Sequence, residues 1–492
     1  MTIVQMKRSL GPVLMVLLLV VISRYGNSSA QNIEILPEET GVLKKLKQPN
    51  IVLLFSDDAG YGDFGFQGSS VFHTPELDKF ASEGMKFKEA YVSGAVCGPS
   101  RAGLLTGRYQ QRFGFEENNV PGYMSASGLD NEAMGLPTHI PTVANYLDSL
   151  GYQNALLGKW HMGGEDKFHP LRRGFHYFYG FRGGARSYFP YPKEELKDLY
   201  SEKRLEENFG NFKEHEGYLT DVLADKSLEF IKENKNNPFF LMVSFNGVHT
   251  PMEAKKEDLD HFLDLKGKRK TLAAMTLAVD RACGRILDQL KKLGLDDNTI
   301  VIYTNDNGGP TDSNASSNYP LSGTKANHLE GGIRVPFIVR WPEVTKPNTT
   351  YPYPVSTLDL LPTFVSTAGG DINQMKELDG VDLKPYISGE LKERPHEYLY
   401  WKKENRGVVR ANDWKLLRFP DRPAELYNIA EDIPERKNLA SQYPEKVKEL
   451  YKKLFVWEAE LERPLWQLKR LYEVKAMKRM DEYRTSLKNP KG

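Results

Sequence analysis

Cysteine is scarce in this sequence: the 492 residues contain two, at positions 97 and 283. At most one disulfide is therefore available, which excludes the disulfide-rich scaffolds that many small exported domains use. Cys283 lies in an amphipathic pattern over residues 271–290 and is expected to be a small core residue of a helix. A Cys97–Cys283 disulfide is the structural alternative, although the neighbours of Cys97 favour a different role.

An excess of either charge is also missing, because 66 lysines and arginines face 65 aspartates and glutamates and leave a formal net charge of +1. This balance argues against nucleic acid as a partner and against global attraction of an anion. Any preference for an anionic ligand must come from local placement of charge. Hydrophobic residues make up 40% of the chain, enough for a sizeable core, and the length suits one large domain plus a smaller one.

Long hydrophobic runs are absent except at the N-terminus, where residues 13–22 are apolar. Lys7 and Arg8 precede this run and the small residues of 27–30 follow it, which is the order of a secretory signal peptide. We therefore expect a signal peptide at 1–30, a periplasmic or secreted mature protein, and no membrane contact after cleavage. The run is shorter than the roughly 20 residues of a membrane span, and the alternative is an uncleaved signal anchor.

Four short apolar runs predict the buried strands of a sheet: 51–55, 154–157, 239–245 and 299–303. Each is flanked by turn-forming residues and is rich in Val, Ile, Leu or Phe. Helical patterns lie between them at 75–82, 141–150 and 220–233. Thr74 and Pro75 suit the start of the first helix. This alternation predicts the α/β fold class, with a mostly parallel sheet between layers of helices.

The pattern becomes irregular in two Pro- and Gly-rich stretches, 342–354 and 369–389, so we place a domain change near 370–385. The expected divisions are a leader at 31–48, a catalytic domain at 49–370 and a smaller α+β subdomain at 371–492. Within the subdomain, short antiparallel strands are expected at 398–401, 407–410 and 414–418. From Pro444 to about Tyr483 the pattern is helical and heavily charged, which predicts solvated terminal helices packed on the body.

Polar residues follow each of the four predicted strands. Ligands of open α/β sheets bind beyond the carboxyl ends of the strands, so these residues are candidates for one site. Oxygen-only donors, which select Ca²⁺ or Mg²⁺ over zinc, come from Asp57, Asp58, Asp306 and Asn307. Cationic or protonatable groups come from Lys159, His161, His249, Arg101 and Lys325. A metal surrounded by such groups suits the binding of sulfate or phosphate. The alternative role for the adjacent aspartates, Asp57 and Asp58, is to cap a helix or to solvate a loop.

Residues 60–65 match the G-x-G-x-x-G fingerprint of dinucleotide-binding proteins. Asp57 and Asp58 precede the match and would repel a pyrophosphate, and no helical pattern begins at Gly65. We interpret the glycines as positions where the backbone turns tightly around a metal. An exported dinucleotide enzyme is kept as an alternative.

The segment 97–108, CGPSRAGLLTGR, is the most specific motif in the chain. Pro99 suits the first turn of a helix, so residue 97 is expected at a helix N-terminus, where backbone N–H groups favour an anion. The segment resembles the signature of the formylglycine-dependent sulfatases, and the alternative is an unmodified buried cysteine before an ordinary helix. Further motifs resemble this family, in its order along the chain, over roughly residues 49–370: 57–63, 158–163, 249–251, 306–308, Lys325 and 330–336.

The resemblance implies the alkaline-phosphatase-like fold and a specific chemistry. A maturation enzyme would oxidise Cys97 to formylglycine, and the hydrated aldehyde would attack sulfur to form a covalent sulfated intermediate. The family's metal site would be one Ca²⁺ held by Asp57, Asp58, Asp306, Asn307 and residue 97. The remaining implied roles are orientation of the hydrate by Arg101, binding of sulfate oxygens by Lys159 and Lys325, and expulsion of sulfate with help from His161. His249 would lie near the leaving oxygen, with Lys325 sharing protonation or charge stabilisation there.

An arginine- and aromatic-rich stretch at 181–191, together with Asn118, is a candidate for the rim of the pocket. Arg182 and Arg186 would pair with acidic groups of a sugar chain, and the alternative is a solvated surface loop. With the signal peptide, the stretch favours a sulfated polysaccharide or oligosaccharide, and the sequence resembles bacterial sulfatases that act on marine algal glycans such as ulvan or carrageenan. Two alternatives stay open: a phosphomonoester or phosphonate hydrolase of the same fold, and a non-catalytic glycan-binding relative.

Overall fold

The computed structural model of the chain describes residues 48–197, 203–375 and 377–484. The predicted signal peptide lies outside the described residues, and so does the predicted leader except for its last residue. Among the described residues, no helix has the length and apolar character needed to cross a membrane.

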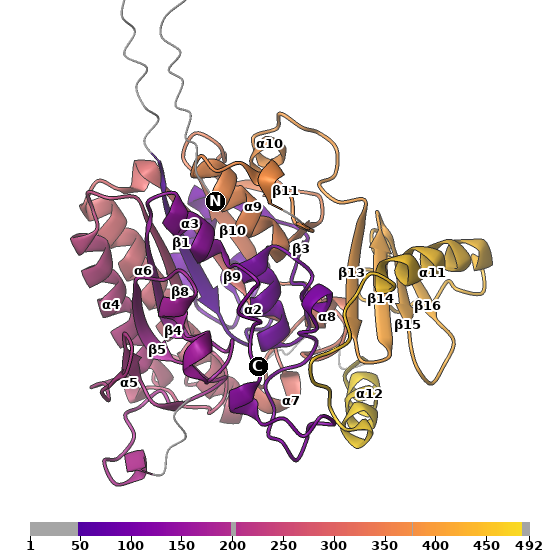
Figure 1. The fold of residues 1–492 in the computed structure, drawn as a ribbon, viewed down its shortest axis with the longest axis horizontal. Coiled ribbons are helices and arrows are strands. Elements are labelled where there is room, and N and C mark those ends of the chain that lie inside the picture. The colour runs from indigo at the N-terminus through magenta and orange to yellow at the C-terminus, as the bar shows by residue number, and fades with distance from the viewer. Residues whose placement is uncertain (1–47, 198–202, 376, 485–492) are drawn as a thin grey trace, which may run out of the picture. The chain divides into compact units, whose positions relative to one another are not determined.

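Four parallel strands form the centre of a ten-stranded sheet (Figure 1). They are β1 (Asn50–Ser56), β8 (Phe239–Ser244), β4 (Gln153–Lys159) and β9 (Thr299–Asn305). β1 lies between β8 and β9, and Leu53 is level with Met242 on one side and Ile302 on the other. All four predicted strands are therefore confirmed, and their near-continuous apolar sequences reflect burial on both faces.

The outer strands make the sheet mixed. β5 (Tyr177–Phe181) continues the parallel set beside β4, whereas β10 (Phe337–Arg340) runs antiparallel to β9. Short strands complete the edges: β2 (Met85–Phe87), β11 (Thr349–Tyr351), β6 (Glu206–Glu207) and β7 (Asn211–Phe212). A separate pair joins β3 (Ala90–Tyr91) to β12 (Val355–Ser356).

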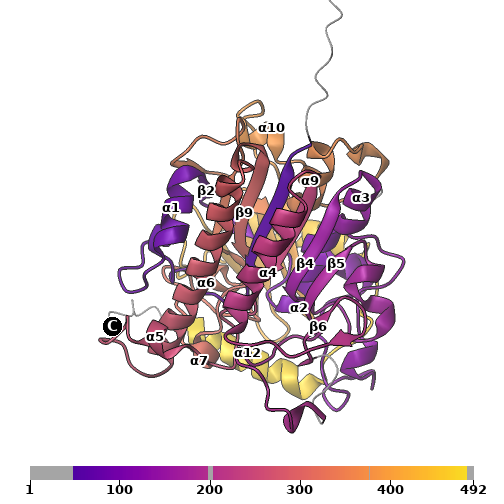
Figure 2. The ribbon, with the colours of Figure 1, turned by 90° about the vertical axis from the view of Figure 1, so that its left-hand side faces the viewer.

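Helices cover both faces of the sheet, because successive residues of each strand point to opposite sides. Val52 and Leu54 of β1 pack in a core with the helices α1 (Pro75–Glu83), α4 (Leu219–Glu233) and α6 (Gly267–Lys292). Ile51, Leu53 and Phe55 pack in a second core with α2 (Cys97–Thr106), α3 (Val143–Ser149) and α9 (Leu360–Thr367). Figure 2 shows α4 and α6 lying across one face. The predicted α/β sandwich is confirmed.

The other helices before the antiparallel sheet are short. One-turn α-helices are α5 (Lys256–Leu259), α7 (Thr311–Asn314), α8 (Glu330–Ile333) and α10 (Lys384–Ile387). Turns of 3₁₀ helix lie at Gly65–Gln67, Gln110–Phe113, Asn131–Ala133, Asp166–Phe168, Pro170–Arg172, Glu195–Lys197, Asp296–Asn298, Thr357–Asp359 and Ile372–Gln374. The helix predicted from residue 141 begins two residues later, because Thr142 and Asn145 form a capping box at its start.

Two alternatives from the sequence are wrong. Cys97 and Cys283 are both free thiols, so the disulfide is absent from the structure. The glycine motif at 60–65 leads only into a single 3₁₀ turn, not into the helix that a dinucleotide site requires. Its first glycine instead permits a close contact between loops, since a Cβ at Gly60 would lie 2.4 Å from the backbone oxygen of Ser317.

An antiparallel sheet follows the body in sequence, in the order β13 (Tyr398–Lys403), β14 (Arg406–Ala411), β15 (Trp414–Arg418) and β16 (Glu425–Asn428). The first three strands were predicted and the fourth was not. The charged terminal stretch is two helices, α11 (Pro444–Glu458) and α12 (Arg470–Arg484), separated at 459–469, where Pro464 cannot continue a helix. Leu454 and Trp457 of α11 pack on this sheet.

A buried ionic network joins the antiparallel sheet to the body. The Lys415 ammonium on β15 lies 2.8 Å from a carboxylate oxygen of Glu330 in α8 and 2.9 Å from one of Glu435, and all three side chains are fully buried. Arg410 on β14 pairs with Glu89 and donates to the Tyr91 hydroxyl beside it. These charges are withdrawn from water and depend on one another for compensation.

Replacement of Lys415 by alanine is expected to lower the free energy of unfolding by about 3–5 kcal/mol, the usual cost of leaving buried charge without its partner. Denaturant unfolding measures the loss. Lys448→Ala is the matched control, because Lys448 pairs with Glu445 on an exposed face of α11, and it should change stability by less than about 0.5 kcal/mol. Equal losses in the two variants would contradict a special contribution from the buried network.

Candidate active site

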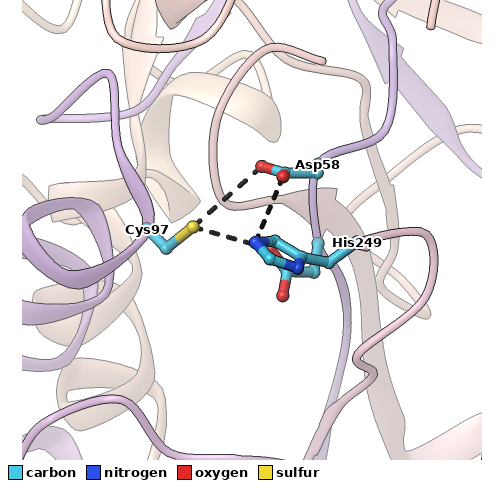
Figure 3. A group of neighbouring side chains, drawn as sticks. Asp58, Cys97 and His249 are labelled. Atoms are coloured by element: carbon cyan, nitrogen blue, oxygen red, sulfur yellow. Dashed lines mark hydrogen bonds and ion pairs between the residues drawn. The ribbon is translucent and has the colours of Figure 1, made fainter. Parts of the chain in front are cut away.

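The polar residues that follow the central strands meet at one edge of the sheet, as the sequence predicts. Asp57 and Asp58 directly follow β1, and Asp306 and Asn307 directly follow β9. Since the two strands are parallel neighbours, their carboxyl ends lie side by side. Figure 3 shows Cys97 and His249 pointing toward Asp58. Ligand atoms within 4.8 Å of one another come from Asp57, Asp58, Cys97 and His249.

Cys97 is the first residue of α2, which confirms its predicted place at a helix N-terminus. Only 1% of its surface is exposed. Its Sγ atom lies 3.6 Å from Asp57 Oδ1 and accepts a hydrogen bond from the Lys325 ammonium at 3.0 Å. Burial, and then the nearby Asp306 carboxylate, raise the pKa of the thiol to about 12, so the thiol is protonated at neutral pH.

Two lysines each pair with one of the adjacent aspartates. Lys159, the last residue of β4, donates from Nζ to Asp57 Oδ2 at 2.5 Å, and both side chains are fully buried. Lys325 lies 2.7 Å from Asp58 Oδ1 and donates to Asp58 Oδ2 at 2.8 Å. The Lys325 ammonium therefore lies between a carboxylate and the Cys97 sulfur.

Arg101, one turn along α2 from Cys97, neutralises the third carboxylate. Its Nε and one Nη atom donate to Asp306 Oδ2 at 3.1 and 2.9 Å. The other Nη atom donates to the Ser244 hydroxyl at 2.6 Å, at the end of β8. The guanidinium is thus locked between two strand ends, and it also stacks over the Phe55 ring.

The three carboxylates have different proton affinities. Burial and then the Asp306 charge raise the pKa of Asp57 to about 8, despite the opposing effect of Lys159. Burial would also raise the pKa of Asp306, but Arg101 and Lys159 hold it below its usual value. Crowded carboxylates repel one another, so further positive charge among them would be favourable.

The donor set fits a hard divalent cation. Oxygens of Asp57 and Asp58 lie in the cluster of ligand atoms, and Asp306 Oδ1 accepts a hydrogen bond from the Asp58 N–H at 3.2 Å. Asn307 adds a side-chain oxygen that is buried without a hydrogen-bond partner among the described residues. A buried amide oxygen without a partner is costly, and a metal ion is one way to satisfy it. Oxygen-rich donors of this type select Ca²⁺ or Mg²⁺ over softer metals.

Two residues of the site have left-handed backbones. Asp58 has φ 60° and His161 has φ 61°. Side chains other than glycine adopt this region at a cost of about 1–3 kcal/mol, and such residues concentrate at functional sites. Asp58 lies two positions after the end of β1 and His161 two positions after the end of β4, and both side chains belong to the site.

The two histidines are neutral near pH 7. Burial, and then the charges of Lys159 and Arg101, keep the pKa of His161 well below its usual value. Burial lowers the pKa of His249 to about 4, although Asp58 opposes the shift. The Nδ1 atom of His249 lies 2.6 Å from the Thr250 carbonyl oxygen, so Nδ1 carries the proton. Its Nε2 atom, 3.5 Å from Asp58 Oδ2, is then free to accept one.

A cavity of about 310 Å³ opens over these groups. Its floor is formed by Cys97, His161, His249 and Lys325, and its walls include Asn118, Asn119, Asn131, Arg182 and Lys203. Asn118 was predicted at the rim and does line the cavity. Its side-chain oxygen accepts a hydrogen bond from the Gly98 N–H at 2.8 Å, which connects the wall to α2.

The two arginines predicted to contact substrate are placed differently. Arg182 lines the cavity, but its guanidinium is paired with both oxygens of Glu206 at 2.8 Å and with Asp166 at 2.7 Å. Arg186 does not line this cavity: its fully buried side chain donates to Glu214 at 2.7 Å and stacks over Tyr191. The structure therefore does not support the predicted substrate contact by Arg186, because the loop folds this charge inward.

Sequence reasoning missed Asn131 and Lys203 on the cavity wall and Ser244 behind Arg101. Lys203 lies in a run of ordinary surface charges, and Asn131 lies in an irregular segment, so neither carries a local signal. Ser244 is the last residue of β8 but lies inside the predicted strand 239–245, so a survey of the residues after each strand passed over it.

The candidate site lies within a region of the chain that matches a known family. A model of the Sulfatase family matches residues 49–370, and a model described as N-sulphoglucosamine sulphohydrolase, C-terminal, matches residues 325–461. The chain belongs to the sulfatase family. The match spans more than half of this sulfatase and contains each of the predicted catalytic and metal-binding positions.

Relatives extend the similarity to almost the full described chain. N-acetylgalactosamine-6-sulfatase of Mus musculus is 34% identical, covering 71% of this chain and 68% of that protein, and arylsulfatase J of Mus musculus is 29% identical, covering 83% and 75%. The crystal structure of Ps i-CgsB in complex with k-i-k-neocarrahexaose is 34% identical, covers 89% of this sulfatase and 100% of that chain, and has a TM-score of 0.80. The alkaline-phosphatase-like fold is confirmed, and the enzyme is a sulfuric ester hydrolase.

Protein treated with a chelator is expected to gain thermal stability when Ca²⁺ is added, because a ligand that binds only the folded state stabilises it, by about 2.7 kcal/mol at a hundred times its Kd. Melting curves at increasing Ca²⁺ measure the gain, and Asp58→Asn should abolish most of it. Asp63→Asn is the control: Asp63 is buried in the same loop but pairs with Arg269, so the gain should persist. A gain that survives in Asp58→Asn would refute this site.

Proposed function

We propose that this sulfatase removes sulfate from a sulfated polysaccharide or its oligosaccharides, with a carrageenan-type glycan as the substrate class. The observation that carries the proposal is the similarity to Ps i-CgsB, whose whole chain is covered and whose structure holds a neocarrahexaose. The signal-peptide pattern supports action outside the cytoplasm, in the periplasm or after secretion, where such glycans are met.

The catalytic chemistry is proposed to start from Cys97 after its conversion to formylglycine. The hydrated aldehyde would supply one hydroxyl to attack sulfur and a second hydroxyl whose deprotonation returns the aldehyde and expels sulfate. The position supports this role: residue 97 lies at the start of a buried helix, on the cavity floor, within hydrogen-bond reach of Lys325. Arg101 would orient the group, since it is locked between Asp306 and Ser244 behind residue 97.

The proposed metal is one Ca²⁺, held by Asp57, Asp58, Asp306, Asn307 and residue 97. When bound, it would lower the pKa of a coordinated oxygen and offset charge on the ester. Charge balance supports it. When Asp57, Asp58 and Asp306 are all ionised, as ligands of a metal, the cations of Arg101, Lys159 and Lys325 match their charge. A divalent cation then leaves an excess of two positive charges, which balances the two negative charges of the sulfate product.

The two histidines are proposed to transfer protons, and Lys325 to stabilise charge. His161 is neutral because of its burial among cations, so it can take a proton from residue 97. His249 presents Nε2 to the cavity, close to where the leaving oxygen of the ester would lie. Burial alone would lower the pKa of Lys325, yet Asp58 and its neighbours hold it well above its usual value. Lys325 is therefore charged and placed to stabilise negative charge on the ester.

The cavity wall supports an anionic sugar chain as the occupant. Three asparagines offer neutral donors and acceptors, and Lys203 lines the wall with no ion pair recorded among the described residues. Arg182, in contrast, is neutralised by Glu206 and Asp166. Lys203 is thus the wall cation that is available to a second acidic group of the substrate, beyond the ester being cleaved.

Mass spectrometry of the peptide that contains position 97 is expected to show loss of the thiol and gain of an aldehyde when the protein is made with a maturation enzyme. Cys97→Ser should give little or no multiple turnover, because a serine lacks the second hydroxyl needed to release sulfate. Steady-state sulfate release measures this. Normal turnover by Cys97→Ser would contradict the proposed cycle.

Defined sulfated oligosaccharides of carrageenan and ulvan type, assayed beside a small aryl sulfate, test the substrate class. We expect carrageenan-type chains to be desulfated, and Lys203→Ala to raise their KM about tenfold, the equivalent of losing about 1.4 kcal/mol of binding, with little effect on the aryl sulfate. Lys193→Ala, an exposed lysine of the same loop that does not line the cavity, is the control. Activity confined to the aryl sulfate would count against a glycan substrate.

A further inference from the structure

The Lys325 ammonium touches both Asp58 and Cys97, yet the backbone that carries it belongs to no helix or strand. The loop lies between α7 and α8, and the residue after Lys325, Ala326, has the left-handed φ of 72°. Lysine has a long flexible stem with many rotamers. The position of its ammonium therefore depends on how firmly this loop is held.

One support comes from the end of the chain. Arg479 lies in α12, more than 150 positions after Lys325 in sequence, and its Nη1 atom donates to the Lys325 backbone oxygen at 2.6 Å. The other edge of the same guanidinium is paired with Asp312 in α7, with Nε 2.6 Å from a carboxylate oxygen. Asp312 belongs to the loop that begins with the metal-site residues Asp306 and Asn307. Arg479 thus joins the Lys325 loop to the loop that follows β9.

A second support comes from β14 of the antiparallel sheet. The Nη1 atom of Arg406 donates to the Ala326 oxygen at 3.0 Å, and its other Nη atom is held by Glu404 at 2.8 Å. On the opposite side, the Ala326 N–H donates to the Ala95 oxygen at 2.8 Å, two residues before Cys97. The backbone at 325–326 is therefore fixed between the C-terminal region and the start of α2.

We propose that Arg479 is a positioning residue of this sulfatase: by holding the Lys325 carbonyl and Asp312 together, it sets the Lys325 ammonium against residue 97 and the ester. The inference rests on the proposed role of Lys325. A planar guanidinium suits the task because it binds a carboxylate along one edge and has a further N–H for the carbonyl. Misplacement of a catalytic group by about 1 Å costs on the order of 10²-fold in rate.

Arg479 is also the better residue to test, because it is partly exposed whereas Arg406 is buried. A matched control lies beside it. Arg422, in the turn between β15 and β16, pairs with Asp481 of the same helix α12 at 2.8 and 2.9 Å, with similar exposure. Among the described residues it contacts no catalytic loop. Loss of Arg422 therefore loosens α12 without removing the bond to Lys325.

The experiment compares Arg479→Met, Arg479→Lys and Arg422→Met in the full chain, with kcat and KM for an aryl sulfate and melting temperatures. Arg479→Met is expected to lower kcat at least tenfold, and Arg479→Lys to recover part of the loss, since lysine still donates to the carbonyl. Arg422→Met should lower the melting temperature about as much as Arg479→Met and leave kcat within about twofold. Equal losses of kcat in both methionine variants, or none in either, would overturn the proposal.

A double-mutant cycle identifies the residue through which Arg479 acts. In a Lys325→Ala background, measured by single turnover, Arg479→Met should lower the rate by less than about twofold, because the group it positions is gone. A tenfold loss in that background would show a route that does not pass through Lys325. Full activity of Lys325→Ala alone would instead refute the proposed role of Lys325, which distinguishes that failure from a failure of Arg479.

Discussion

The buried carboxylates of Asp57, Asp58 and Asp306 impose the constraint on which the rest of this site depends. They are crowded at the ends of two adjacent parallel strands, out of contact with water. Arg101, Lys159 and Lys325 surround them at hydrogen-bond distance. Charges buried in this way are tolerated only when they are compensated, and the compensation places six ionic groups around residue 97.

This electrostatic constraint explains why so many separate segments have to meet. The carboxylates come from β1 and β9, the guanidinium from α2, one ammonium from β4 and the other from a loop before α8. The register of the sheet fixes β1, β9 and β4, and packing against the sheet fixes α2. The Lys325 loop has no such scaffold, which is why contacts from β14 and α12 matter to it. The antiparallel sheet and α12 therefore support the catalytic site as well as their own core.

The strands and the floor of the site were predictable because their signals are local. A buried parallel strand is a short apolar run, and a polar residue that directly follows one, such as Asp57 or Lys159, can be identified as a candidate for the site. The motif around Cys97 added the helix start. Contacts between distant segments could not be predicted. They include the ion pair of Arg186 with Glu214, the position of Lys203 on the cavity wall, and the hydrogen bond from Arg479 to the Lys325 carbonyl. β16 has no strong pattern of its own, so packing decides it, whereas the break at 459–469 does have a local signal in Pro464.

All ten residues of α2 are buried. Cys97, at the start of the helix, can be reached only from the cavity that it lines. An enzyme that oxidises a side chain must bring its own reactive centre into contact with it, and the fold leaves only 1% of the Cys97 surface exposed. The proposed conversion of Cys97 would therefore have to precede folding. Oxidation and folding of this chain would then be ordered in time, with the modification made before the core closes.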